Sequence, residues 1–539
     1  MIDSENPRAK NEAAIQQHED PTMSASQSVI SSTVDHTSSI SVHGAEEKED
    51  LEKEKQKEEP YSIWTTGQLV RFLSICAGTG MISPLTASIY LPALNQIQRD
   101  LNTTTEKVNI SITVYMIFQA ISPTFWGTIA DSYGRRPVYL CTMLIYCGAC
   151  IGLALSPNYA ALLIFRMMQA FGSSSVIAIG AGILGDIVDS KRRGSYFGIY
   201  SMGQMLGPVL GPVLGGIIAE KLNWKWIFWI LTIIGGLSVI FVSLFVPETL
   251  RSLVGNGSGY ANPTPFQWLA RRRGQLDEEK IAQIKIANGP RRPMNFLAPF
   301  IYLTEPDVAI TLIFSGFLYC SMYTFMTSTT NQFTIHYNLN ELQIGLCFLC
   351  QGSGSIIGSF VKGKLLDRDF KRLKEKTVRE NPDNPDIEIS FYKARLGGAY
   401  VSLFFVDALP IAYGWAMHYN APLPVALVLQ FLVGVSTSSL TICTQSLIVD
   451  LFPGKGASIT ASNNLTRCLL GAVASVAIEP GIQGVGIGWM FTIVGLLVTV
   501  TNIAVPVLIK FGPKWRARRA ERYKKSNGNL EFTFFKSKK

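Results

Sequence analysis

GTIADSYGRR, residues 127–136, places a carboxylate and two guanidiniums between two long apolar stretches. The preceding stretch reads NISITVYMIFQAISPTFW, and the following one reads PVYLCTMLIYCGACIGLALS. A helix of about 20 apolar residues crosses the hydrocarbon core of a bilayer, so each stretch is long enough to span a membrane. The charged residues between them therefore predict a short polar hairpin at a membrane surface.

The same alternation continues along the chain. Hydrophobic residues make up 47% of the 539 residues and charged residues only 16%, whereas about 25% is usual for soluble domains. Twelve buried helices would leave no polar face toward water, so the sequence predicts an all-α membrane protein with twelve transmembrane helices. The expected spans centre on residues 71–93, 107–130, 137–156, 160–185, 195–219, 226–247, 307–330, 342–366, 394–417, 421–447, 457–479 and 486–510.

The polar segments between these spans predict both the domain limits and the orientation. Lys and Arg gather in every second loop, as at Arg135, Arg136 and 271–273, which predicts cytosolic termini. Because the basic residues lie between apolar stretches, they favour a bilayer and not a nucleic acid as partner. The expected parts are a disordered acidic cytosolic tail (1–60), a six-helix bundle (61–247), a cytosolic linker (248–306), a second six-helix bundle (307–510) and a basic cytosolic tail (511–539).

Two smaller sequence features concern modification and metals. Asn102-Thr-Thr lies in the first predicted outside loop and is a candidate glycosylation acceptor, although an unused sequon is equally expected. The CxxC pairs Cys147–Cys150 and Cys347–Cys350 lie within apolar stretches without further ligands nearby. They are interpreted as small apolar residues one helical turn apart, and no metal site is expected.

The opening stretch has a partial repeat. GKLLDRDFKR, residues 363–372, follows the eighth expected span as GTIADSYGRR follows the second. Gly363 and Asp367 match Gly127 and Asp131, and a basic pair ends both stretches, whereas Phe370 stands where the first copy has Gly134. Two parallel halves of this kind are a known transporter architecture.

Together these features resemble the major facilitator superfamily and, more closely, the fungal twelve-span drug:proton antiporters, including the quinidine-resistance type exporters. The resemblance covers roughly residues 62–512 and implies two pseudo-symmetric halves of six helices. GTIADSYGRR resembles the family motif G-x-L-A-D-x-x-G-R-[RK], which implies a conformational latch between the halves. A plain positive-inside anchor would explain only the arginines. The expected latch residues are Gly127, Asp131, Gly134, Arg135, Arg136, Gly363 and Asp367, with Gly127 and Gly134 allowing a tight turn and close helix approach.

Two further motifs carry the resemblance. LLIFRMMQAFGSSS resembles R-x-x-Q-G-x-G through Arg166 and Gln169, which implies proton coupling through a nearby acid; a structural arginine is the alternative. We assign Asp407 of the ninth span to this coupling group, with a purely structural role equally open. GQMLGPVLGPVLGG, residues 203–216, resembles the antiporter motif G-x-x-x-G-P-x-x-G-G, which implies a hinge between the halves; a generic packing face also explains the glycines. The expected hinge residues are Gly207, Gly211, Pro212, Gly215 and Gly216.

Polar and aromatic residues at membrane depth predict a substrate cavity. Arg467 lies near the middle of the eleventh span, which the family places along the cavity. Glu479 lies at the outer end of the same span, where contact with water is expected. The full set of expected cavity residues is Tyr90, Gln119, Tyr323, Asn331, Gln351, Asn463, Asn464 and Arg467.

The resemblance implies a proton-coupled antiporter that exports small amphiphilic or cationic compounds by alternating access. Drugs, organic acids, polyamines and amino acids are all substrates of relatives. A proton-coupled nutrient importer of the same fold and a non-transporting membrane sensor are the alternatives. GSFVKGK at 358–364 lacks the final Ser or Thr of a phosphate loop. We therefore expect a monomer driven by the proton gradient, without cofactor or enzymatic activity, in the plasma membrane or in a vacuolar or other internal membrane.

Overall fold

The computed structural model describes residues 61–188, 193–274, 281–282, 300, 302–380, 390–452 and 456–525. The expected tail over residues 1–60, part of the linker and the end of the basic tail lie outside these ranges. No strand occurs among the residues that are described. The all-α expectation is therefore confirmed for this part of the chain.

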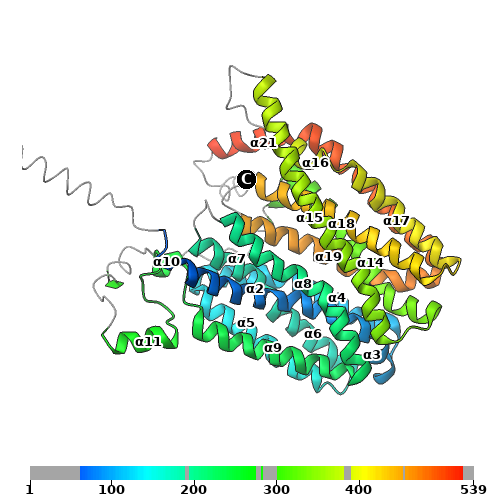
Figure 1. Ribbon diagram of the computed structural model, residues 1–539, viewed down its shortest axis with the longest axis horizontal. Coiled ribbons are helices and arrows are strands. Elements are labelled where there is room, and N and C mark those ends of the chain that lie inside the picture. Colours follow the sequence, from blue (N-terminus) through cyan, green and yellow to red (C-terminus); the bar gives the residue numbers. More distant parts are fainter. Residues whose placement is uncertain are drawn as a thin grey trace, which may run out of the picture. The chain divides into compact units, whose positions relative to one another are not determined.

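The N-terminal half forms one group of helices (Figure 1). Short polar side chains begin several of them, because an Asn or Thr oxygen can accept from the free amides of a first helical turn. Thr65, Thr104 and Asn158 cap α2, α4 and α6 in this way. The helices are α2 (Thr66–Ile89), η1 (Leu91–Ala93), α3 (Leu94–Asp100), α4 (Thr105–Tyr133), α5 (Arg135–Ala154), α6 (Tyr159–Ser173), α7 (Ser175–Ile187), α8 (Arg193–Lys221) and α9 (Trp224–Phe245), followed by α10 (Arg251–Val254) and α11 (Pro265–Arg272).

The C-terminal half forms the second group. Left-handed asparagines, Asn338 and Asn420, close the turns that follow α14 and α17. Asparagine tolerates this backbone region better than most residues, which explains its place at tight turns. The helices are α14 (Pro306–Tyr337), α15 (Glu341–Glu380), α16 (Phe391–Leu396), α17 (Tyr400–His418), α18 (Leu423–Leu451), α19 (Gly456–Val485), α20 (Ile487–Asn502) and α21 (Ala504–Lys525).

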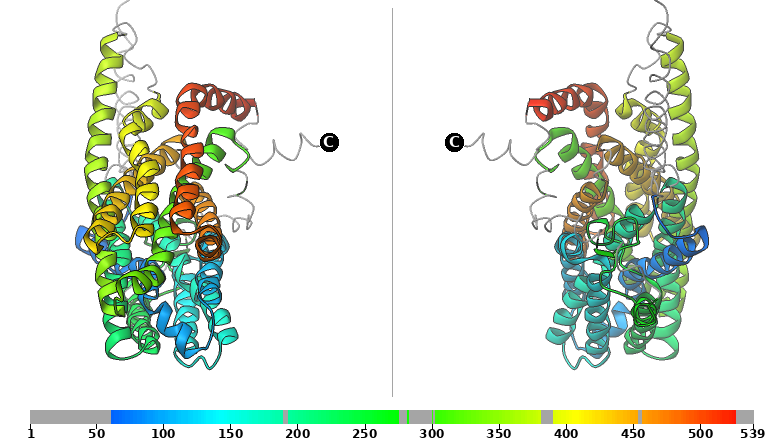
Figure 2. Two further views of the ribbon diagram at one scale, coloured as in Figure 1. Left: turned by 90° about the vertical axis from the view of Figure 1, so that its right-hand side faces the viewer. Right: turned by 90° about the vertical axis from the view of Figure 1, so that its left-hand side faces the viewer.

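Each of the twelve expected spans coincides with a long helix or a pair of consecutive helices. Eleven helices of the described chain are long and apolar enough to cross a membrane. The remaining expected span, 195–219, is occupied by α8, which has 29 residues. Two differences stand out: the fourth span divides into α6 and α7 around Ser174, and α15 continues well past the expected end at residue 366 (Figure 2).

Among the described residues, two helix pairs make the most extensive contacts between the halves: α4 packs against α19, and α8 packs against α15. We call these two contacts the seams. We call the end of the bundle that carries Arg135 the inner end, which the sequence predicts to be cytosolic, and the opposite end the outer end. The polar contacts described between the halves extend from the outer end to the middle of the helices, as with Asn95 to Thr334 (2.7 Å) and Asn464 to the Gln119 carbonyl (3.0 Å).

Candidate transport site and latch

Arg166 lies in an aromatic cage inside the N-terminal half. Only 1% of the residue is exposed. Its guanidinium carbon lies 3.7 Å from the centre of the Tyr90 ring and 4.8 Å from that of Tyr115. Its Nη1 donates to Gln169 Oε1 (2.9 Å), while its Nε has no hydrogen-bond partner in the described chain. Cation–π contacts and one amide thus replace the carboxylate that a buried guanidinium usually needs.

The structure brings together only two of the three expected proton-coupling residues. Gln169 contacts Arg166 and donates to Cys150 Sγ (3.2 Å). Asp407 lies in the other half on α17, where both of its carboxylate oxygens accept from Asn502 Nδ2 of α20 at 2.8 Å. Asp407 therefore ties two helices of the C-terminal half to each other and is not the acid beside Arg166.

A second arginine, Arg467, lies on α19 at the seam with α4. Its Nε and Nη2 both donate to Asn464 Oδ1, at 3.2 and 2.9 Å, and its guanidinium lies 5.0 Å from the centre of the Tyr319 ring. The Tyr323 ring packs 4.8 Å from that of Tyr319. Like Arg166, Arg467 has aromatic and amide neighbours but no carboxylate among its described partners.

Several of the expected cavity residues carry buried polar atoms that the protein leaves without a partner. Gln119 Oε1, Asn463 Oδ1 and both polar atoms of the Gln351 amide are in this state within the described chain. Leaving such an atom without a hydrogen bond costs about 1–3 kcal/mol, so each needs water or a ligand. These amides come from α4, α19 and α15, the helices of the two seams.

The remaining expected cavity residues occupy two different places. Tyr90 is fully buried against Arg166 and shares a hydrogen bond with Ser111 (2.8 Å). Asn331 lies toward the outer end, where its Nδ2 donates to Glu479 Oε1 (2.7 Å). Glu479 is only 5% exposed, so the expectation that it is simply hydrated is wrong in this conformation.

The expected latch residues form a polar cluster at the inner end. Arg135 pairs with Asp131 (2.6 Å) of its own hairpin and with Asp186 (3.1 Å) at the end of α7. Arg136 donates to the carbonyls of Ser243, Val246 and Pro263, at 2.6, 3.1 and 2.8 Å. All of these partners belong to the N-terminal half and the start of the linker. Among the described side chains, which do not include that of Asp367, the contacts of this cluster stay within one half and do not bridge the two.

Glu248 is a member of this cluster that the sequence reading missed. It follows α9, is 2% exposed, and accepts from the backbone N–H groups of Arg135 (2.8 Å) and Arg136 (3.4 Å). Asn262 Nδ2 also donates to it (2.9 Å). At the first turn of α5, the Glu248 carboxylate accepts from the free backbone amides of the helix. Its negative charge is also stabilised by the positive end of the helix dipole. The Pro-Glu dipeptide at 247–248 was the available signal.

The two glycines of the hairpin have different roles. Gly134 has φ +116° and ψ 150°, a region that is essentially restricted to glycine. A Cβ there would also overlap Glu248 and Asn262. Gly127, by contrast, has nothing within 4 Å of the place where a Cβ would lie. The expected tight turn at Gly134 is confirmed, but the expected close helix approach at Gly127 is wrong in this conformation.

The second copy of the motif does not form a second hairpin. Residues 363–372 lie within α15, which is continuous to Glu380. Phe370 stands where Gly134 ends α4, and a bulky residue does not adopt the backbone conformation of Gly134. Gly363 has open space around it, as Gly127 does, and the side chain of Asp367 lies outside the described set.

The C-terminal half instead places a different arginine at the equivalent position. Arg395 lies on α16, just before α17, the long helix of the ninth span, and Arg135 lies at the start of α5, the helix of the third span. Its Nε pairs with Asp450 (2.7 Å) at the end of α18, the tenth span, as Arg135 pairs with Asp186 at the end of the fourth. Its guanidinium also lies 4.9 Å from the centre of the Phe370 ring. The functional counterpart of Arg135 was therefore missed, because it lies outside the repeated sequence.

A further buried cluster ties α21 to α14 at the inner end of this half. Arg519 Nη1 pairs with Asp307 Oδ1 (2.6 Å), and the Tyr392 hydroxyl donates to Asp307 Oδ2 (2.5 Å). Burial, followed by the neighbouring Asp307 carboxylate, raises the pKa of Tyr392, so this tyrosine stays protonated at physiological pH. The cluster is a structural tie that fixes the end of the last helix.

The glycines of the expected hinge motif serve both a helix of the same half and a seam. A Cβ at Gly207, Gly211 or Gly215 would overlap α2, and Ser88 of α2 donates to the Gly207 carbonyl (3.1 Å). On another face of α8, a Cβ at Gly216 would overlap the backbone of α15, and one at Gly345 would overlap the Pro212 carbonyl. Small residues on both faces let α8 approach two helices at backbone distance.

The Major Facilitator Superfamily model matches residues 76–476. The chain belongs to the major facilitator superfamily. This superfamily member is 36% identical to "Citrate exporter 1" of Aspergillus niger over 89% of its own length and 93% of the relative's. It is 32% identical to "Multidrug transporter QDR2" of Candida glabrata, over 85% and 83% of the two chains. It is also 32% identical to "Quinidine resistance protein 1" of Saccharomyces cerevisiae, over 87% and 88%.

A solved superfamily structure supports the fold. The E. coli xylose transporter XylE, in a partially occluded inward-open conformation, aligns with a TM-score of 0.59 at 13% identity, over 83% of this chain and 98% of that chain. The protein is thus a multi-pass membrane transporter of small molecules with the major facilitator fold, and not an enzyme.

Proposed function

We propose that the transporter exports small organic acids as anions, by alternating access and in exchange for protons. The observation that carries this proposal is the charge of the membrane interior. Its two arginines, Arg166 and Arg467, have no carboxylate among their described partners. The membrane carboxylates Asp407 and Glu479 bond to amides elsewhere. Neither buried guanidinium is therefore compensated by a neighbouring carboxylate among the described residues.

This charge distribution discriminates between substrate classes. A cation that enters the seams must approach uncompensated guanidiniums in a medium of low dielectric constant, which is costly. A carboxylate can pair with a guanidinium through two parallel hydrogen bonds, which a planar fork favours. The partnerless amides of Gln119 and Gln351 can hydrogen-bond the remaining polar groups of such a substrate. We therefore rank organic acids above the cationic compounds that the motifs suggested.

The names of the relatives fit both substrate classes. One relative is named a citrate exporter, and two are named for multidrug transport or quinidine resistance. Amphiphilic drugs remain the second candidate, because aromatic rings surround both arginines. The interior charge favours the first candidate.

The direction of transport follows from physical driving forces. In a cell with a negative interior, the exit of one unit of negative charge releases about 2.3 kcal/mol per 100 mV. Entry of a proton in exchange adds the proton gradient to this driving force. No cofactor is required for either. A plasma membrane location and a monomeric state are part of the proposal, and a fluorescent fusion and light scattering on the purified protein test them.

The test uses purified protein in liposomes loaded with citrate or with quinidine, with the potential set by potassium and valinomycin. We expect citrate efflux that rises with a negative interior and carries protons inward, reported by a trapped pH dye. Arg467→Gln should lower citrate efflux about tenfold, whereas Arg518→Gln, at an exposed position of α21, should leave it unchanged. Efflux of quinidine without that of citrate or other organic acids would overturn the substrate class. Uphill uptake with protons would favour an importer.

A further inference from the structure

We propose that Glu479 takes up the external proton and that its protonation allows the outer end of the transporter to close. This inference rests on the proposed proton exchange and names the residue that begins it. It concerns the seam between α4 and α19, where the two halves meet.

The register of this seam places Glu479 between the halves. Along α19 toward the outer end, Asn464 bonds the Gln119 carbonyl (3.0 Å), Gly471 faces Met116, and Ser475 bonds Thr113 (2.7 Å). The partners on α4 descend as those on α19 ascend, as expected for an antiparallel pair. The next turn of each helix brings Glu479 opposite Asn109, which is also buried.

Glu479 has hydrogen-bond donors but no positive partner in this conformation. Asn331 Nδ2 of α14 donates to it (2.7 Å), and Gln483 lies within hydrogen-bond reach one turn along α19. The Glu106 carboxylate on α4 lies near enough to repel a charge on Glu479. The two amides can donate to a carboxylate, but they are neutral and bring no positive charge to compensate the burial of an ionised Glu479.

The other titratable groups of the surrounding helices lie elsewhere. On α14, His336 is bonded to the Gln332 carbonyl (3.0 Å). Lys107 on α4 is exposed. The α20 helix carries no ionisable residue, and Asp450 of α18 and Asp186 of α7 lie at the inner end, paired with arginines. Among the described residues of the packed helices, none offers Glu479 a salt bridge.

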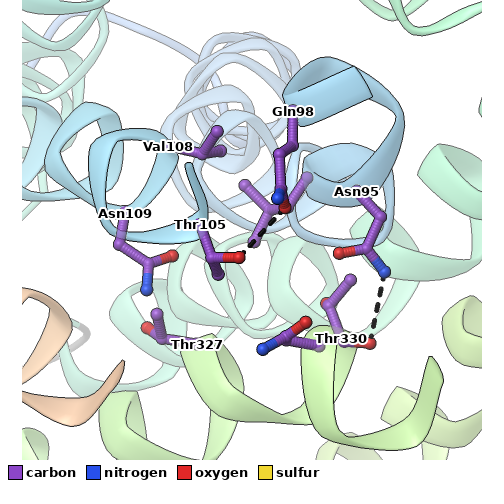
Figure 3. Close-up of a pocket in the computed structure, with 9 residues that line it drawn as sticks. Asn95, Gln98, Thr105, Val108, Asn109, Thr327 and Thr330 are labelled. Carbon is purple, nitrogen blue, oxygen red and sulfur yellow. Dashed lines mark hydrogen bonds between the residues drawn. The ribbon is translucent and has the colours of Figure 1, made fainter. Parts of the chain in front are cut away.

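A small hollow lies between the halves, and one of the residues that line it is Asn331, the donor to Glu479 (Figure 3). Asn109 and Thr327 point into it from α4 and α14, and Asn331 lines it while holding Glu479. At the outer end, Asn95 of the N-terminal half donates to Thr334 of the C-terminal half (2.7 Å), and Arg99 pairs with Glu341 (2.6 Å); we call these two contacts the rim. Separation of these rim contacts would admit external water to the hollow and to Glu479.

The coupling follows from the cost of burying charge. When the rim is open, water solvates the Glu479 carboxylate and a proton from the external solution can bind to one oxygen. When the rim is closed, an ionised Glu479 would lose that water without gaining a cation, which is unfavourable for a buried charge. Protonation removes this cost, so external acid favours the closed outer end and alkali favours the open one. The ion gradient is thereby linked to the conformational cycle.

The experiment measures the conformation directly. Spin labels at Asn102 and Asn420, exposed turn residues on the outer end of the two halves, report the distance across the rim in nanodiscs without substrate. The native cysteines are replaced by alanine in this background, and thermal unfolding in comparison with the wild type confirms that it is folded. We expect the wild type to shift from the closed to the open population as the pH rises from 5 to 8.

Three variants at two membrane carboxylates decide the outcome. Glu479→Gln should stay closed at both pH values, with at least a tenfold smaller change in the open-to-closed ratio, and Glu479→Asp should restore the response. Asp407→Asn, the matched control at the periphery of the same half, should respond as the wild type does. A wild-type response in Glu479→Gln would overturn the inference, as would no response in the wild type. Because nanodiscs need no substrate or gradient, failure of citrate export in liposomes would refute only the proposed function.

Discussion

In the N-terminal half the chain leaves α4 at Gly134 and begins α5 at the next residue, whereas in the C-terminal half α15 runs on to Glu380 before α16 begins at Phe391. In both halves an arginine that follows this helix nevertheless pairs with an aspartate. Arg135 meets Asp186, and Arg395 meets Asp450. The ion pair is thus kept while the connection that carries it has changed.

The difference shows which residue of the repeated motif determines its shape. Gly127 and Asp131 have counterparts in Gly363 and Asp367, yet only the copy that contains Gly134 forms a turn. The positive φ of Gly134 directs the chain back, and Glu248 then caps the new helix. Where Phe370 replaces the glycine, the helix continues and its ring packs against Arg395.

The largest effect should come from adding one methyl group to the turn. Gly134→Ala forces a side chain into a glycine-only backbone region and into Glu248, so we expect a loss of about 2–3 kcal/mol in stability. Thermal unfolding of the purified protein, followed by fluorescence-detected size exclusion, measures the change. Gly363 is the counterpart of Gly127 in the second copy of the motif and has open space around it. Gly363→Ala should therefore leave the stability unchanged or raise it slightly. Equal losses in both variants would show that the backbone at Gly134 is not the cause.

A smaller effect should show whether the two ion pairs, Arg135–Asp186 and Arg395–Asp450, stabilise their halves equally. In double-mutant cycles with Arg135→Gln and Asp186→Asn, and with Arg395→Gln and Asp450→Asn, we expect a coupling of about 1 kcal/mol in each half. The same unfolding measurement provides the four values of each cycle. Coupling in the N-terminal half together with none in the C-terminal half would show that Arg395 is not the counterpart of Arg135.

The smallest effect should come from Asp131. Its side chain is 58% exposed and pairs with Arg135 over a single helical turn, so Asp131→Asn should change stability by no more than about 0.5 kcal/mol. If the citrate efflux of this variant is nevertheless lost, Asp131 acts in another conformation of the cycle. Normal stability with normal efflux would remove it from the latch altogether.

The spans could be predicted because their signal is local. A stretch of about 20 apolar residues is a property of neighbouring residues in the sequence. The turn at Gly134 could be predicted for the same reason. The extension of α15 could not, because the sequence match to the first hairpin concealed the effect of Phe370.

The site was less predictable because its partners are distant in sequence. Glu248 lies more than a hundred residues from Arg135, and Asn331 lies 148 residues from Glu479. Arg166 and Gln169 could be named from their motif, but the motif does not reveal that tyrosines and not an acid surround the guanidinium. Asp407 was grouped with them because it is a membrane carboxylate, a property that does not say which helix it faces.

The length of α15 has a mechanical consequence. Its 40 residues extend over about 60 Å, twice the thickness of the hydrocarbon core, so about half of the rod projects from the membrane. The α15 helix also forms the seam with α8. When the C-terminal half tilts, the end of α15 near Glu380 must therefore move through a wider arc than any part of the helix inside the bilayer. The position of the inner end of α15 therefore differs between the conformational states more than that of any part of the helix inside the bilayer.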